Sequence, residues 1–313
     1  MTILAVVDIG TNTTRLLVRD LDEPKIDLTR IVKVTGLGKE VEKTGELGEV
    51  GMEQTTKAVL EYVDVAKSFG ATLENILIFA TAGARSAKNG DSFIEELAQN
   101  TGCKCEIISG EFEGQCSFIG AMSGMRDTTS RSVVFDIGGG STEFALSSSS
   151  DSLRCENVVS IPIGSVRITK RHIESDPPKP EELTNAIADT REYLKDVEYQ
   201  IPEIHQAIRW IGVAATVTTT AAIELGLAEF DAQKIHEFVL TRAMVEDVFR
   251  TLATESFADR IHNPGLEKER ADVIVGGVAI IVSIMRHFEL AEITVSCTDL
   301  VDGLWLSVAR KNI

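Results

Sequence analysis

Aromatic residues, cysteine and histidine are all scarce in this chain of 313 residues. Aromatic residues make up only 5% of it, so the hydrophobic core has to rest on Ile, Leu, Val and Ala. The five cysteines are an odd number and lie scattered, which argues against a disulfide framework and predicts a cytoplasmic protein. The five histidines lie far apart without an H-x-H or H-E-x-x-H motif, so histidine-based metal chemistry is not indicated.

Long apolar runs and an excess of positive charge are missing as well. No stretch reaches about 18 apolar residues without a charge, so we expect no membrane span. The first residues lack the basic region and the cleavage site of a signal peptide, and we expect none. The net charge of −17 repels nucleic acid and acidic membranes, and we expect neither as a partner. A polyanionic substrate would need a local basic cleft, loop amides or a metal to bind it.

The length of the chain favours about two domains, and strands alternate with helices along it. Such alternation is typical of a mixed or parallel sheet covered by helices, which is an α/β fold. Apolar runs rich in Val and Ile predict strands at 2–8, 15–21, 75–81, 104–109 and 292–297. The segment 131–148 is predicted as two strands joined by a polar loop, and 209–226 as a strand, a small-residue turn and a helix. Apolar residues at helical spacing predict helices at 52–69, 91–102, 180–199, 241–254, 270–288 and 300–311.

One loop occurs twice, as DIGTNT at Asp8–Thr13 and as DIGGGST at Asp136–Thr142. Each copy follows an apolar strand and precedes another, so the repeat predicts a second lobe of the same design. Glycine lets the backbone approach a ligand closely, and loop amides and hydroxyls donate to phosphate oxygens. The aspartate at the strand end can hold a divalent cation. Two such loops facing each other would clamp phosphate and Mg²⁺, which predicts a phosphate-handling enzyme.

Blocks along the whole chain carry a resemblance to a known family. They are Asp8–Val18, Phe79–Arg85, Ile107–Gly120, Val134–Phe144, Gly164–Arg167, Ile211–Ala222 and Asn263–Ile281. Together they resemble the exopolyphosphatase and guanosine pentaphosphate phosphatase family, the Ppx/GppA phosphatases, in its short two-domain form. The combination of FATAGAR with SGEFEG is specific to that family.

The resemblance implies the actin-like ATPase fold shared by acetate kinase, Hsp70 and actin. In this fold two similar ribonuclease H-like lobes enclose a cleft. We expect the first lobe at residues 1–124 and the second at 125–299, with the helix at about 300–313 able to pack back on the first. A homodimer is expected from the family alone.

Carried over by motif, the resemblance places the catalytic glutamate at Glu113, as the general base that activates water, and the family's arginine at Arg85. The expected metal is Mg²⁺, with Mn²⁺ as the alternative, held by Asp8, Asp136 and Glu143. The expected phosphate ligands are Thr11, Asn12, Arg15, Gly138, Gly139, Gly140 and Ser141. Lys39 and Arg167 are either part of a basic path for a chain-like substrate or ordinary surface charges.

Exopolyphosphatase activity is the first expectation, and a pppGpp 5′-phosphohydrolase is the alternative that the motifs do not separate from it. An ATP-dependent kinase of the same fold is less favoured, because Glu113 is present and no P-loop occurs. The presence of both Glu113 and Asp136 argues against a filament or sensor protein that binds nucleotide without turnover. The turn Gly212–Thr216 lacks the glycine that the family usually has near the threonine, and Val301 stands where the family commonly has arginine.

Overall fold

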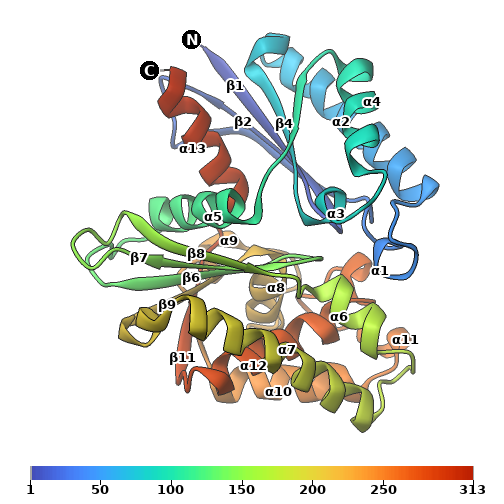
Figure 1. The fold of residues 1–313 in the computed structure, drawn as a ribbon, viewed down its shortest axis with the longest axis vertical. Coiled ribbons are helices and arrows are strands. Elements are labelled where there is room, and N and C mark those ends of the chain that lie inside the picture. Colours follow the sequence, from blue (N-terminus) through green and yellow to red (C-terminus); the bar gives the residue numbers. More distant parts are fainter. Residues whose placement is uncertain (1, 313) are drawn as a thin grey trace.

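Two β-sheets, each flanked by helices, build the computed structural model of the chain, which describes residues 2–312 (Figure 1). The first sheet has the strand order β3-β2-β1-β4-β5, in which β1 pairs antiparallel with β2 and parallel with β4. Its strands are β1 (Ile3–Ile9), β2 (Thr13–Asp20), β3 (Asp27–Val34), β4 (Ile76–Ala80) and β5 (Lys104–Ile107). Every residue of β1 is buried, as its sequence, apolar except at Asp8, predicts for a central strand covered on both faces.

The second sheet repeats this design in the order β10-β11-β9-β6-β7-β8. Its strands are β6 (Ser132–Ile137), β7 (Thr142–Ser147), β8 (Cys155–Ile161), β9 (Arg209–Val213), β10 (Val239–Thr241) and β11 (Glu292–Val295). Apart from the added edge strand β10, the order, the antiparallel hairpins and the parallel central pairs match the first sheet. Two ribonuclease H-like lobes of this kind form the actin-like fold, so the predicted fold class is confirmed.

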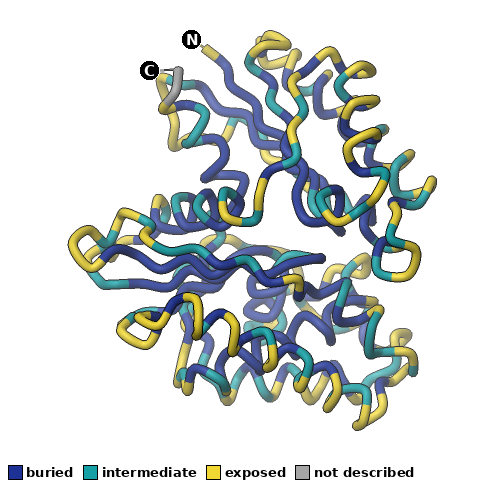
Figure 2. Tube along the Cα trace, in the orientation of Figure 1, coloured by how far each residue is buried: buried dark blue, intermediate teal, exposed yellow. Residues whose placement is uncertain are grey.

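Helices cover both sheets, and the strands lie buried within the hydrophobic cores of the two lobes (Figure 2). The first lobe carries α1 (Val41–Thr44), α2 (Glu49–Ser68), α3 (Ala82–Arg85) and α4 (Gly90–Thr101). The second carries α6 (Ser165–His172), α7 (Pro180–Gln200), α8 (Ala214–Glu224), α9 (Ala232–Ile235), α10 (Arg242–Thr254), α11 (Phe257–Arg260) and α12 (Ile274–His287). The predicted helices all form, although α12 starts four residues later than expected because residues 268–270 make a short 3₁₀ turn.

Two further helices complete the fold. Helix α5 (Gly110–Gly124) lies between the lobes, and α13 (Leu300–Asn312) packs on α5 and on the first lobe (Figure 1). Helix α13 also contacts the first sheet, where the buried Trp305 donates its indole N–H to the carbonyl oxygen of Leu4 at 3.0 Å. Phe118 of α5 packs instead on the second sheet. The expected boundary at residue 124 therefore follows a helix that contacts both lobes. Residues 1 and 313, which end the predicted ranges, lie outside the described residues.

Within residues 2–312, no helix has the length and apolar composition needed to cross a bilayer.

Candidate functional site

The two repeated loops fold in the same way at the ends of equivalent strands. In the first loop the amide of Gly10 donates to the carbonyl oxygen of Thr13 at 2.8 Å. In the second the amide of Gly138 donates to the carbonyl oxygen of Ser141 at 3.0 Å. Each turn lies between the strands of an antiparallel hairpin, so Asp8 and Asp136 occupy matching buried positions in the two lobes.

The two loops touch across the space between the lobes. A Cβ atom on Gly139 would lie 2.9 Å from Cβ of Thr11, and one on Gly140 would lie 2.7 Å from Oγ1 of the same residue. Because real Cβ atoms do not approach so closely, only glycine fits at these two positions. The close approach explains the glycines at positions 139 and 140 of the second loop.

A cleft of about 800 Å³ opens beside these loops. Ten of the twelve predicted site residues line it: Asp8, Thr11, Asn12, Arg15, Glu113, Asp136, Gly138, Gly139, Gly140 and Ser141. The other two, Arg85 and Glu143, lie directly behind it, where Arg85 contacts Glu113 and Glu143 approaches Gly114. The structure thus brings the predicted residues together from both lobes and from α5.

Glu113 lies in the first turn of α5, which Ser109 caps by accepting a hydrogen bond from the amide of Phe112 at 3.1 Å. Only 6% of Glu113 is exposed, and Arg85 at the end of α3 donates to its Oε2 atom at 2.9 Å. Burial raises the pKa of Glu113 to about 7, with smaller contributions from Asp136 and Asp8, while Arg85 acts in the opposite direction. A carboxyl group with such a pKa can accept and return a proton near neutral pH.

The other acidic groups of the cleft share one electrostatic environment with Glu113. Burial raises the pKa of Asp136 to about 6, although Ser117 donates a hydrogen bond to its Oδ2 atom at 2.6 Å. The pKa of Glu143 is raised well above its usual range, first by burial and then by the charges of Glu113 and Asp136. Ser160 donates to Oε1 of Glu143 at 2.7 Å. These carboxylates repel one another, so the cleft favours a cation.

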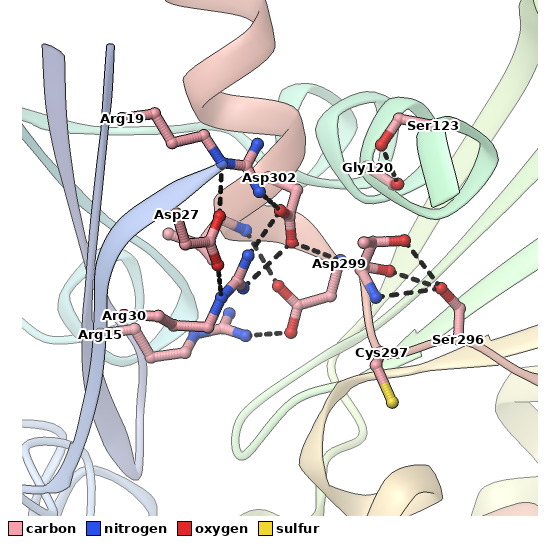
Figure 3. Close-up of polar contacts among 12 residues, drawn as sticks. Arg15, Arg19, Asp27, Arg30, Gly120, Ser123, Ser296, Cys297, Asp299 and Asp302 are labelled. Atoms are coloured by element: carbon pink, nitrogen blue, oxygen red, sulfur yellow. Dashed lines mark hydrogen bonds and ion pairs between the residues drawn. The ribbon is translucent and has the colours of Figure 1, made fainter. Parts of the chain in front are cut away.

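Arg15 is the positive charge in contact with Asp8, another acidic residue of the cleft. Its Nε and Nη2 atoms lie 2.8 and 2.7 Å from Oδ2 of Asp8, and its Nη1 atom forms an ion pair with Asp299 (Figure 3). Burial raises the pKa of Asp8, and the contact with Arg15 opposes that rise. The sequence prediction did not include Asp299, Ser117 or Ser160, because none of them belongs to a recognisable loop or to the SGEFEG block.

Several buried polar atoms around the cleft have no partner within the protein. They are Oδ1 of Asp8, Oε2 of Glu143, Oγ1 of Thr11, Oδ1 of Asn12 and Oγ of Ser141. Among the described residues no three Asp, Glu, His or Cys side chains converge closely enough to hold a metal by themselves. Mg²⁺ is usually bound by one or two carboxylates, with water and substrate phosphates as its other ligands. The residues present fit Mg²⁺ held in that way, and the free hydroxyls fit phosphate oxygens.

The weaker sequence candidates lie elsewhere. Lys39 pairs with Asp272 at 3.4 Å and Arg167 pairs with Glu42 at 3.4 Å, and both pairs join the first lobe to the second. Neither residue lines the large cleft. The start of α8 does line it, and its first residue, Ala214, has a φ of +66°, a conformation that costs energy for a residue with a Cβ atom.

Comparisons with known proteins agree with this geometry. The sequence profile described as the Ppx/GppA phosphatase family matches residues 19–312. Exopolyphosphatase 2 of Mycobacterium tuberculosis is 31% identical over 99% of both chains. A bifunctional 3-dehydroquinate synthase/phosphatase of Fusobacterium nucleatum is 32% identical over 96% of this chain, which spans only 45% of that relative. The crystal structure of an exopolyphosphatase-like protein matches with a TM-score of 0.93 and 28% identity, over 100% of both chains.

Proposed function

Since this chain belongs to the Ppx/GppA phosphatase family and is therefore a phosphatase, we propose that it is an exopolyphosphatase, which hydrolyses the terminal phosphate of inorganic polyphosphate. The name of the Mycobacterium tuberculosis relative, which matches over nearly its full length, supports this choice of substrate. The observation that carries the proposal is Glu113, buried at the cleft beside Arg85 with a pKa near neutrality.

In the proposed reaction Glu113 orients a water molecule and accepts one of its protons. The water oxygen forms a bond to the terminal phosphorus while the bond from that phosphorus to the bridging oxygen breaks. The products are inorganic phosphate and a polyphosphate one unit shorter, whose new terminal oxygen carries the electron pair of the broken bond. Arg85 holds the Glu113 carboxylate in place and can donate to a phosphate oxygen.

Asp8, Asp136 and Glu143 would hold Mg²⁺, or Mn²⁺ in its place, and the metal would neutralise charge on the phosphates when bound. The amides of Gly139 and Gly140 and the hydroxyls of Thr11 and Ser141 would bind the terminal phosphate, together with the side-chain amide of Asn12. Gly138 would shape the loop around that phosphate, because its own amide donates to Ser141. The positive charge of Arg15 offsets part of the negative charge of Asp8 and Asp136, because Arg15 lies among the carboxylates. Phosphoryl transfer depends mainly on such positioning and charge neutralisation.

Hydrolysis of pppGpp at its 5′ end is the second candidate. The cleft of about 800 Å³ is much larger than a terminal phosphate, and it extends to Phe230, whose side chain is 57% exposed. An exposed aromatic ring at the far end of a phosphate site could stack on a base. The extension of the cleft to Phe230 is therefore the observation that favours a nucleotide substrate as the second candidate.

We further propose a cytoplasmic homodimer. The five cysteines all lie within the described residues and form no disulfide there, which agrees with a reducing compartment. The dimer rests on the family resemblance, and light scattering during gel filtration tests it.

The decisive experiment measures phosphate release from polyphosphate, pppGpp and ATP in the presence of Mg²⁺, for the wild type and for Glu113→Gln. Loss of the general base should lower the polyphosphate rate by about 10²- to 10⁴-fold. Glu111→Gln is the matched control, because Glu111 lies exposed in the same turn of α5. A Glu113→Gln variant with the wild-type rate would refute the mechanism, and faster release from pppGpp would select the second candidate.

A further inference from the structure

The guanidinium group of Arg15 forms ion pairs with two carboxylates at the edge of the cleft. Arg15 of β2 contacts Asp8 of the neighbouring strand β1 through Nε and Nη2, and contacts Asp299 through Nη1 (Figure 3). Asp299 immediately precedes α13, so it reaches Arg15 from the opposite end of the chain. Arg15 and Asp299 are both mostly buried, and water therefore screens their interaction only in part.

Asp299 is itself held firmly. Its Oδ1 atom accepts from the amide of Val301 at 3.1 Å, and its own amide donates to Oδ2 of Asp302 at 3.1 Å. Its carbonyl lies so close to α5 that a Cβ atom on Gly120 would be only 1.8 Å away. The Asp299 carboxylate is thus fixed relative to the first lobe and can hold Arg15 in one orientation.

Beyond Asp299, a second group of ion pairs continues along the same wall of the cleft. Asp302 accepts from both Arg19 and Arg30, and Asp27 pairs with the same two arginines (Figure 3). Neither Asp27 nor Asp302 has an ion pair with Arg15 among the described residues. This wall therefore contains two groups of ion pairs, one around Arg15 and one around Arg19 and Arg30. Only the group around Arg15, which includes Asp299, contacts Asp8 of the proposed metal site.

We infer that Asp299 is a positioning residue that sets, through Arg15, how strongly Asp8 can bind a divalent cation. The group of Arg15, Asp8 and Asp299 carries one net negative charge. If a neutral side chain replaced Asp299, the net charge would be zero and Arg15 would interact with Asp8 alone. A cation at Asp8 would then have to compete with a guanidinium that has no other carboxylate partner. This inference rests on the proposed function, because it assumes that Asp8 is a metal ligand.

The test measures Mn²⁺ binding to the full-length protein without substrate, by electron paramagnetic resonance of the free and bound ion. Asp299→Asn should weaken Mn²⁺ binding about tenfold or more, as expected for loss of a nearby, partly buried charge. Asp299→Glu should restore binding to within about threefold of the wild type. Asp27→Asn is the matched control and should leave the affinity within the same range, since Asp27 does not contact Arg15.

Arg15→Gln tests the inference by removing the guanidinium instead of Asp299. This variant is the decisive one if the melting temperature shows that Asp299→Asn does not fold. Removing the competing guanidinium should strengthen Mn²⁺ binding. Wild-type affinity in Asp299→Asn, an equal loss in Asp27→Asn, or unchanged affinity in Arg15→Gln would overturn the inference while leaving the proposed function intact. If the wild type itself binds no Mn²⁺, the proposed metal site fails and the inference fails with it.

Discussion

Arg85 and Glu113 are joined through a nitrogen that also contacts the residue just before the cap of α5. Nη1 of Arg85 donates to Oε2 of Glu113 at 2.9 Å and to the carbonyl oxygen of Ile108 at 2.8 Å. Ile108 immediately precedes Ser109, the residue that caps α5. The same guanidinium therefore orients the proposed base and ties its helix to α3.

This contact leads to a prediction about pH. The pKa of Glu113 is about 7 and the base has to be ionised to accept a proton, so kcat/KM should rise with pH through about 7 and then level off. Arg85 lowers that pKa, because its positive charge stabilises the carboxylate. In Arg85→Gln the rising limb should therefore move to higher pH. The midpoint of the limb, measured from kcat/KM against pH, reports this shift separately from any loss of phosphate binding.

Lys88→Gln provides the control for the pH experiment. Lys88 is exposed a few residues after Arg85 and has no ion pair with Glu113 among the described residues. Its removal changes the net charge by the same amount and should leave the midpoint where it is. A midpoint that stays in place in Arg85→Gln would show that the guanidinium does not control the ionisation of Glu113.

The contact between the repeated loops leads to a second prediction. A Cβ atom on Gly139 would lie 2.9 Å from Cβ of Thr11 and 3.3 Å from the amide nitrogen of Asn12. Since Thr11 and Asn12 belong to the other lobe, Gly139→Ala should push the lobes apart at the phosphate site. Even a displacement of about 1 Å can cost on the order of 10²-fold in rate. We expect kcat/KM for polyphosphate to fall by roughly that factor.

Gly138→Ala separates this effect from a general disturbance of the loop. The nearest atom to a Cβ at Gly138 is the carbonyl oxygen of Ser141 at 3.2 Å, within the same loop. This substitution does not reach the first lobe and should cost less activity than Gly139→Ala. Equal losses in the two variants would contradict the role assigned to contact between the lobes. Melting temperatures of both variants show whether either change acts through stability.

The strands that carry the site could be predicted because their signals are local. The run Ile3–Ile9 is apolar at every position except Asp8, and the buried strand ends in an aspartate–glycine turn. The second copy around Asp136 has the same pattern, so the repeat alone predicts two lobes. Edge strands carry a weaker local signal. Residues 27–34 form β3 with a mixed, partly exposed pattern, and only pairing with β2 makes them a strand.

The partners of the site residues could not be predicted, because they depend on contacts between distant segments. Asp299 meets Arg15 across 284 positions of sequence, and only the packing of α13 on the first lobe brings them together. Ser117 is one of several small residues in α5, and nothing in its neighbourhood points to Asp136. The raised pKa of Glu113 likewise results from burial between the lobes, which no local pattern encodes.

Ion pairs join α1 of the first lobe to α6 of the second. Glu42 of α1 lies 2.9 Å from Nη2 of Arg171 and 3.4 Å from Nε of Arg167, both on α6 of the second lobe. The three side chains are partly buried, so solvent screens them less than it screens a fully exposed pair. Helix α5 lies between the lobes at another place (Figure 1), so these pairs can stabilise a separate contact between the lobes.

Glu42→Gln should therefore raise KM for polyphosphate by about two- to fivefold at low salt, since partly exposed ion pairs contribute about 0.2–1 kcal/mol each. The difference from the wild type should shrink as salt is added, because salt screens the pairs that the variant lacks. Glu192→Gln is the control, because Glu192 pairs with Lys195 within α7 alone. Substrate saturation curves at low and high salt test both points. Identical KM values for Glu42→Gln and the wild type at low salt would mean that packing between the lobes, rather than these charges, keeps the cleft closed.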